Sequence, residues 1–175
     1  GSRCNYIKEK VALIHSRLCV IDIENGIQPM SAKYGDKEYT LVYNGELYNT
    51  DEIRNELIEH GHKFLGHSDT EVILKSYVQW KEKCLEKFNG IFAFAIWDNY
   101  EQHLFFARDR IGVKPLFYTV KNNSLIFGSE IKALLEHKYV KAEKISCVIV
   151  FILGILLYAN TGINTGIKAS VYVMA

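Results

Sequence analysis

The chain has 175 residues and a mass of 20.1 kDa, a length that suits one domain around a single core and excludes two large domains. With 49% hydrophobic and 23% charged residues, its composition is neither that of a disordered chain nor that of a collagen. A net charge of +1 excludes a basic field that would attract nucleic acid or an anionic membrane. Lys168 is the only Asp, Glu, Lys or Arg after Lys144, so nearly all of the charge lies in the first 144 positions.

The cysteines indicate neither a metal site nor a redox motif, because they form no C-x-x-C pair and have no histidine at ligand spacing. A chain of this size with a full core needs no disulfide bonds, so we expect reduced thiols and a cytoplasmic protein. Gly1-Ser2 resembles a cloning remnant, and no signal peptide opens the chain. The four cysteines are Cys4, Cys19, Cys84 and Cys147.

The first part of the chain predicts strands. Val11–Ile23 is rich in β-branched residues and leucine and ends at Asn25-Gly26, which predicts one or two strands closed by a turn. Tyr39–Tyr43 predicts a further strand that stops at Asn44-Gly45.

Two helices are predicted next. Asn49 can cap the first helix, with Glu52 three residues on and Gly61 available for the left-handed conformation after its end. Ser68 and Glu71 have the spacing of a capping box and predict the start of the second helix. The apolar faces would be Ile53, Leu57 and Ile58 on the first helix, and Val72, Ile73, Tyr77 and Trp80 on the second.

The second half predicts a four-stranded meander and a short helix. The strands are 91–97, 103–108, 116–120 and 125–127, and Ser129 is expected to cap a helix over 130–135. Strands, two helices and a further run of strands favour an α+β layered domain over an alternating doubly wound one.

The apolar run 145–159 has 15 residues. That is shorter than the roughly 17 to 25 residues that span a bilayer, so it favours a buried helix or strand over a membrane anchor.

Three short segments carry residues that could bind a substrate. Arg17 stands inside an otherwise apolar strand, and its guanidinium could hold a carboxylate in two parallel hydrogen bonds. Asn44 and Gly45 could aim a side-chain amide and a backbone N–H at one oxygen, as an oxyanion hole does. Asp69, in a helix's first turn, could hold a substrate ammonium.

Each segment also has a purely structural interpretation. Arg17 could form an ion pair on an edge strand, Asn44-Gly45 could be a turn, and Asp69 could serve only the helix dipole. Together, however, the three describe a pocket for an α-amino acid whose side-chain carbonyl is attacked. Glutamine fits that description.

The sequence resembles the class II glutamine amidotransferase domain of glutamine-hydrolysing asparagine synthetases, from about Tyr6 to at least Glu143. Tyr43-Asn44-Gly45 stands where amidophosphoribosyltransferases and glucosamine-phosphate synthases have His-Asn-Gly, which favours the asparagine synthetase group. The motifs that carry the resemblance are Arg17–Asp22, Gln28–Met30, Tyr43–Asn49, Ser68–Glu71, Phe88–Trp97, Ala107–Tyr118 and Gly128–Ala133.

The resemblance implies a four-layer α/β/β/α sandwich of the N-terminal-nucleophile hydrolase type. It implies that Arg17 binds the glutamine α-carboxylate, that Asp69 and Glu46 hold the α-amino end, and that Asn44 with Gly45 forms the oxyanion hole. Leu18 and Val20 match positions that line the pocket through their backbone. Ammonia would pass to a synthetase domain, which alone would need ATP and magnesium. No cofactor or metal is expected in this domain.

The sequence departs from the family at the nucleophile, a cysteine at the mature N-terminus whose own amine serves as base. Cys4 follows three residues and stands only 13 before Arg17, so we expect the nucleophile and the first strand to be missing. Cys19, with His15 on the same side of an extended strand, is a weak substitute. An unpaired inner-sheet edge would then favour homodimers.

The synthetase half is also expected to be absent, because the chain contains no Ser-Gly-Gly-x-Asp-Ser segment. Residues 3–144 would form the amidotransferase domain, and 145–175 its divergent closing segment. The leading prediction is a glutaminase domain that binds L-glutamine, hydrolyses it in an intact protein, and is inactive as this isolated chain. The alternative is a non-catalytic glutamine-binding or protein-interaction module derived from that domain.

Overall fold

The computed structural model describes residues 2–8, 10–17, 27–137, 140 and 168–173. Their elements are β1 (Ser2–Lys8), β2 (Val11–Arg17), β3 (Met30–Tyr34), β4 (Lys37–Leu47), α1 (Thr50–Glu59), α2 (Asp69–Trp80), the 3-10 helix η1 (Lys81–Lys87), β5 (Gly90–Asp98), β6 (His103–Arg108), β7 (Phe117–Lys121), β8 (Ser124–Gly128), α3 (Ile131–Leu135) and β9 (Lys168–Val173).

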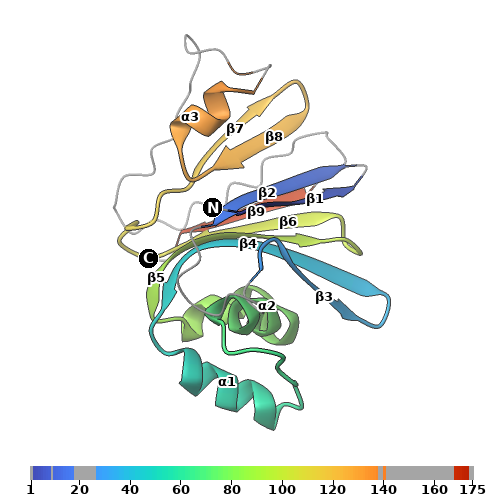
Figure 1. The fold of residues 1–175 in the computed structure, drawn as a ribbon, viewed down its shortest axis with the longest axis vertical. Coiled ribbons are helices and arrows are strands. Elements are labelled where there is room, and N and C mark those ends of the chain that lie inside the picture. The colour runs from blue at the N-terminus through green and yellow to red at the C-terminus, as the bar shows by residue number, and fades with distance from the viewer. Residues whose placement is uncertain (1, 9, 18–26, 138–139, 141–167, 174–175) are drawn as a thin grey trace.

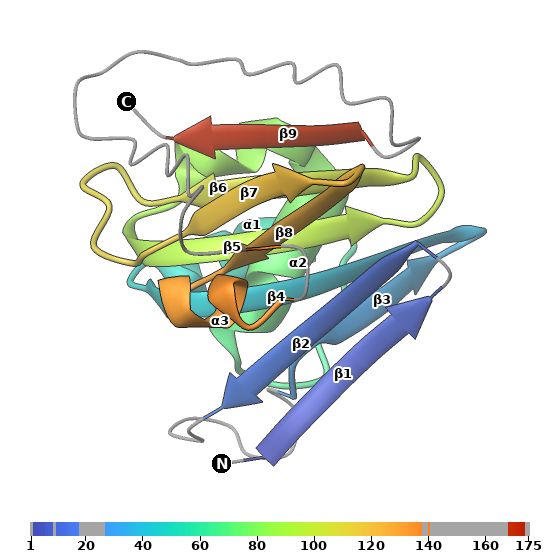
Figure 2. The ribbon, with the colours of Figure 1, turned by 90° about the horizontal axis from the view of Figure 1, so that it is seen from above.

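The elements form four layers, as the α/β/β/α prediction requires (Figure 1). A five-stranded sheet in the order β3-β4-β5-β6-β9 has α1 and α2 on one face. The hairpins β1-β2 and β7-β8 lie over its other face, and α3 packs on β7-β8 (Figure 2). The missing first strand concerns chain before Gly1 and stays a prediction.

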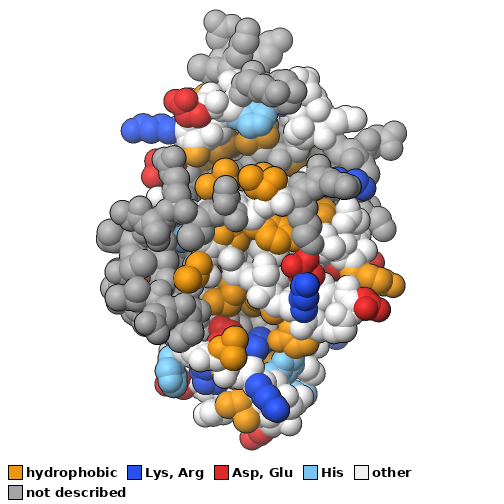
Figure 3. Space-filling model, turned by 45° about the vertical axis from the view of Figure 1, so that its right-hand side comes forward, with side chains coloured by type: hydrophobic (Ala, Val, Ile, Leu, Met, Phe, Trp, Pro, Cys, Tyr) orange, Lys and Arg blue, Asp and Glu red, His pale blue; other side chains and the backbone are white. Residues whose placement is uncertain are grey.

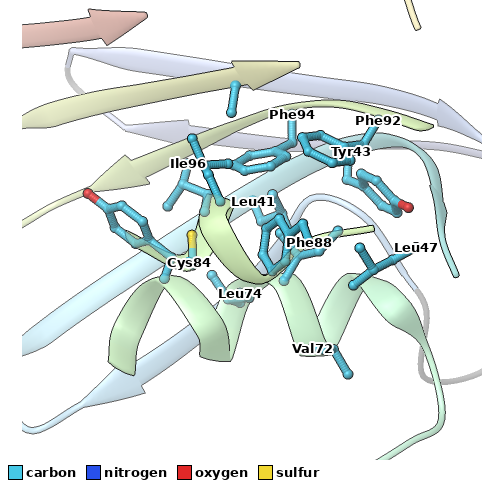
Figure 4. Packing of buried hydrophobic residues seen from close by; sticks show 14 of the residues in the cluster. Leu41, Tyr43, Leu47, Val72, Leu74, Cys84, Phe88, Phe92, Phe94 and Ile96 are labelled. Atoms are coloured by element: carbon cyan, nitrogen blue, oxygen red, sulfur yellow. The ribbon is translucent and has the colours of Figure 1, made fainter. Parts of the chain in front are cut away.

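Because successive side chains of a strand point to opposite faces of the sheet, the main sheet has a hydrophobic core on each face. On the helix side, Leu41, Tyr43 and Leu47 of β4 pack with Phe92 and other side chains of β5 and α2 (Figure 4). On the opposite side, the core consists of Leu13, Val42, Ala95, Trp97, Leu104 and Phe106. Burying both faces explains why β5 reads as a continuous apolar run.

The ends of α1 and α2 test the predicted helix caps. Ser68 accepts a hydrogen bond from the Glu71 N–H at 3.3 Å, so the predicted cap of α2 is confirmed. Gly61 follows α1 with φ of +87°, also as expected. Asn49 occupies the N-cap position of α1 as predicted, but its side chain makes no capping hydrogen bond, because it bonds the Lys87 carbonyl and the Asn89 N–H instead.

Three other local predictions need correction, and some elements were not predicted. Ile58 is 51% exposed, because the core beneath α1 is filled by Ile53 and Leu57. The Ser129 cap is wrong, since Glu130 occupies the N-cap position of α3 and makes no side-chain cap. The expected meander breaks after β6, because β7 and β8 form a separate sheet. Strands β1 and β3 and the 3-10 helix were not predicted.

The closing part of the chain contributes β9, which pairs in parallel with β6 from Lys168 to Val173. The division at residue 144 stays a prediction, and the apolar run 145–159 lies outside the described residues. Within the part of the chain that the structure describes, no helix is both long and apolar enough to cross a membrane.

Candidate functional site

Four of the predicted site residues, Asn44, Gly45, Glu46 and Asp69, lie in or beside a part of β4 that has an open edge. Strand β5 pairs with β4 from Tyr39 to Leu47, whereas the pairing of β3 with β4 stops at Leu41. Beyond Leu41, therefore, the edge of β4 that faces β3 has no strand partner among the described residues. Side chains form hydrogen bonds with the β4 backbone there, because buried backbone N–H and C=O groups need partners. We call residues 43–47 on this side the β4 edge.

Three side chains bind the backbone of the β4 edge. The Gln28 Oε1 accepts a hydrogen bond from the Tyr43 N–H at 2.6 Å. His15 Nε2 lies 3.1 Å from the Tyr43 carbonyl oxygen and donates to it, since a carbonyl only accepts. The Asp69 Oδ2 accepts from the Leu47 N–H at 3.3 Å. These bonds bring the loop before β3, strand β2 and the start of α2 to one place.

Asp69 uses only one of its carboxylate oxygens for these bonds. Its Oδ2 accepts the Leu47 N–H and also the Tyr43 hydroxyl, the latter at 2.7 Å. No hydrogen bond to Oδ1 occurs within the described residues. Asp69 is partly exposed in the first turn of α2, where the helix dipole favours an anion. Among the described residues, the carboxylate is thus held through Oδ2 alone.

The Tyr43 phenol belongs to both the core and the site. Tyr43 is 4% exposed, and Figure 4 shows its ring within the helix-side cluster with the oxygen turned outward. Burial raises the pKa of the phenol well above its ordinary value, and the neighbouring Asp69 carboxylate raises it further. The hydroxyl therefore keeps its proton and acts as a donor.

Asn44 and Gly45 lie inside β4, so the interpretation of this pair as a turn is wrong. A Cβ on Gly45 would overlap the Ile91 carbonyl oxygen and lie 2.7 Å from the Phe92 Cα, and a Cβ on Gly90 would overlap the Glu46 carbonyl oxygen. Glycine is needed because β4 and β5 approach closely here. The sequence signal of a turn was in fact the signal of a close strand contact.

The side chains of Asn44 and Glu46 are exposed. By the alternation of a strand they lie on the face that also carries Val42, opposite to Tyr43 and Asp69. The structure thus brings Asn44, Gly45, Glu46 and Asp69 to one end of β4 but places them on two sides of that strand.

Arg17 is the last residue of β2, two residues beyond the His15 contact with Tyr43. The strand that carries Arg17 is therefore anchored at the β4 edge, while its side chain is outside what the structure describes. Leu18 and Val20, and also Cys19, lie outside the described residues.

Sequence reasoning missed Tyr43 and gave Gln28 no role. Tyr43 was named only as the end of a predicted strand and as part of a motif, and the structure places it in the helix-side core. Gln28 is only 7% exposed, yet its neighbours in sequence give no indication of burial. Only the three-dimensional position of each polar tip connects them to the site.

The structure also contains a groove that does not coincide with the β4 edge. This groove of about 830 Å³ runs between β3 and the ends of α1 and α2, lined by Met30, Tyr34, His62, Leu65 and Lys75 among others. None of the predicted site residues lines it. The described residues also contain no cluster of three or more His, Cys, Asp or Glu that could hold a metal. On the face in Figure 3, basic side chains lie scattered among acidic and apolar ones.

Comparison with known proteins identifies the class. The chain belongs to the glutamine amidotransferase domain family, whose sequence profile matches residues 2–163. A solved glutamine phosphoribosylpyrophosphate amidotransferase from Bacillus subtilis has a similar fold, with a TM-score of 0.58 and 24% identity over 70% of this chain and 28% of that one. This likeness supports the predicted N-terminal-nucleophile hydrolase fold.

Within that class, the chain is similar to asparagine synthetases. It is 53% identical to the glutamine-hydrolysing asparagine synthetase 3 of Bacillus subtilis over 156 residues, which are 88% of this chain and 25% of that protein. Asparagine synthetase 1 of the same organism is 46% identical over 127 residues, or 73% of this chain and 20% of its own length. The chain thus spans a quarter or less of these relatives and aligns with their glutaminase part.

Proposed function

We propose that the chain binds L-glutamine at the β4 edge and represents the glutaminase part of an asparagine-synthetase-like enzyme. The observation that carries the proposal is the Asp69 carboxylate, held by Tyr43 and Leu47 through Oδ2 with Oδ1 left to a ligand. A carboxylate fixed in this way suits a substrate ammonium, since a charge-assisted hydrogen bond needs a defined acceptor.

The backbone of β4 supports an oxyanion hole beside this carboxylate. Tyr43 and Leu47 direct their N–H groups to the side chains of Gln28 and Asp69, away from β5. Because N–H groups alternate between the two edges of a strand, we expect the Gly45 N–H to point to the same open edge. With the Asn44 amide it would stabilise negative charge on the glutamine amide oxygen. Arg17 would bind the α-carboxylate, and Glu46 would help Asp69 at the amino end.

We propose further that this chain binds glutamine without hydrolysing it. Cys84 is fully buried and the pKa of its thiol is raised by burial, so it is not a nucleophile. Cys4 lies within β1 and Cys19 within the chain, so neither has a free α-amino group to serve as base. In an intact protein, an N-terminal cysteine would supply the attack, and a synthetase domain with ATP and magnesium would consume the ammonia.

Calorimetric titration of the chain with L-glutamine tests binding, with D-glutamine as the stereochemical control. Arg17→Ala and Asp69→Ala are each expected to remove most of the affinity for L-glutamine. Asp51→Ala is the matched control, because Asp51 also stands in the first turn of a helix but is exposed and does not hold Tyr43 or Leu47 as Asp69 does.

Ammonia release tests the second part. No release from L-glutamine is expected above the uncatalysed rate. Turnover that disappears in Cys19→Ala would overturn the assignment of an inactive chain. Failure of the wild-type chain to bind glutamine would overturn the proposed function and favour a protein-interaction module.

A further inference from the structure

The Tyr43 hydroxyl has no role in the predicted glutamine pocket, yet it makes the shortest hydrogen bond to the residue expected to hold the ammonium. The distance from its oxygen to Asp69 Oδ2 is 2.7 Å, against 3.3 Å from the Leu47 nitrogen to the same oxygen. Hydrogen bonds to charged groups are stronger than neutral ones and are sensitive to geometry. The phenol is therefore the main restraint on the carboxylate.

Tyr43 is itself held in place from two directions. Its ring is 4% exposed and packs in the helix-side core, and its backbone N–H and C=O are bound by Gln28 and His15. A buried aromatic ring with few rotatable bonds presents its hydroxyl at a fixed position. Asp69, in contrast, is partly exposed and could rotate about its side-chain bonds if the phenol were absent.

The geometry points to Tyr43 as a positioning residue that gives the glutamine pocket its selectivity for an α-ammonium, by fixing Asp69 through Oδ2 so that Oδ1 faces the ligand. Tyr43 acts through Asp69 and does not touch the reacting amide. This inference rests on the proposed function, because it assigns the source of selectivity within that same site.

The inference predicts a ligand-specific effect of removing one hydroxyl. Tyr43→Phe should weaken L-glutamine binding roughly 5- to 20-fold, the range expected for losing a hydrogen bond to a charged group that holds a second contact. Binding of glutaramic acid, which is glutamine without its α-amino group, should change less than about twofold. A general loosening of the pocket would weaken both ligands alike.

Tyr39→Phe provides the matched control. Tyr39 is also buried on the helix-facing side of β4, at 2% exposure, but its hydroxyl accepts from Lys81 at 3.1 Å, far along the strand from Asp69. This variant should leave the affinity for both ligands unchanged. Thermal unfolding of Tyr43→Phe and Tyr39→Phe shows whether each remains folded at the titration temperature.

A double-mutant cycle separates positioning from direct contact. If Tyr43 acts through Asp69, Tyr43→Phe should have no further effect on L-glutamine affinity in an Asp69→Ala background, provided that titration at high ligand concentration still detects binding.

The outcomes discriminate between the two proposals. Selective loss for L-glutamine, with an unchanged glutaramic acid affinity, supports the positioning role. Equal loss for both ligands, or no loss for either, overturns it while the proposed function stands. If wild-type chain binds neither ligand, the proposed function fails and the role of Tyr43 in it fails too.

Discussion

Asp69 and Asp109 both accept hydrogen bonds from backbone N–H groups, but in different arrangements. Asp109 follows β6 and is 1% exposed. Its Oδ2 accepts from the N–H groups of Phe92 and Lys114 at 3.2 and 3.0 Å, and its Oδ1 from that of Val113 at 2.9 Å. Asp69 is partly exposed and takes both of its bonds on one oxygen.

The two aspartates differ in how many of their carboxylate oxygens the protein itself occupies. Asp109 has both oxygens occupied by the backbone, so it closes the loop after β6 onto β5 and has nothing left for a ligand. Asp69 is held through Oδ2 by the Tyr43 hydroxyl and the Leu47 N–H, and its Oδ1 has no hydrogen bond within the described residues. Charge and residue type do not separate these two residues, but the number of carboxylate oxygens with hydrogen bonds does.

The largest expected effect is on stability at Asp109. Asp109→Ala would leave three backbone N–H groups without their acceptor, at about 3 to 5 kcal/mol of unfolding free energy. Urea denaturation measures this loss. Asp51→Ala, an exposed first-turn aspartate, should change stability by less than about 0.5 kcal/mol. A small loss for Asp109→Ala would remove the contrast between the two aspartates.

Asp69→Asn should show the opposite pattern. The amide can still accept the Tyr43 and Leu47 bonds, so we expect less than about 1 kcal/mol of lost stability. The negative charge for the ammonium is gone, however, and L-glutamine affinity should fall about 30-fold or more, or about 2 kcal/mol. Urea denaturation and calorimetry on the same protein measure both quantities. A stability loss as large as that of Asp109→Ala would make Asp69 structural.

Acid should weaken the Asp109 contacts in a predictable direction. Burial raises the pKa of this carboxyl, but hydrogen bonds from the backbone N–H groups of Lys114, Val113, Phe92 and Gly112 outweigh it, so the pKa is lowered in the folded state. Its stabilising contribution is thus present above the unfolded value of about 4 and is lost as pH falls through the folded pKa.

The measurement is urea denaturation between about pH 6 and pH 2. Wild-type chain should lose more stability over this range than Asp109→Asn, which cannot ionise. Parallel curves for the two proteins would show that Asp109 gains nothing from ionisation in the folded state.

Ser76 should give the smallest effect and tests the converse case, a buried polar group with no partner. It lies in α2 at 0% exposure, and its hydroxyl has no hydrogen-bond partner in the described part of the chain. Ser76→Ala should therefore leave stability unchanged or raise it by up to about 1 kcal/mol. Thermal unfolding checks this, and a clear loss would reveal a bond to the hydroxyl that the structure does not contain.

Signals confined to a few neighbouring residues predicted local structure well. The Ser68 cap and the Gly61 helix end depend on contacts within one turn, so spacing alone was sufficient. Asn44-Gly45 was misleading because a glycine occurs both in turns and in close strand pairs, and only the approach of Ile91 and Phe92 from β5 shows which applies here. Strand β3 was missed because its alternation is short and only partly buried.

Periodicity, caps and motifs are local properties, so the layered α+β class and the two helices could be predicted from the sequence alone. The residues of a glutamine pocket remain a prediction from the same kind of signal. The point at which β3 stops along β4, and therefore the position of the β4 edge, is known only from the folded chain. The same is true of the carboxylates: Asp69 bonds Tyr43 and Leu47 through one oxygen, whereas Asp109 bonds backbone N–H groups through both. Such allocation depends on residues distant in sequence, and each hydrogen bond forms only where folding brings donor and acceptor within reach.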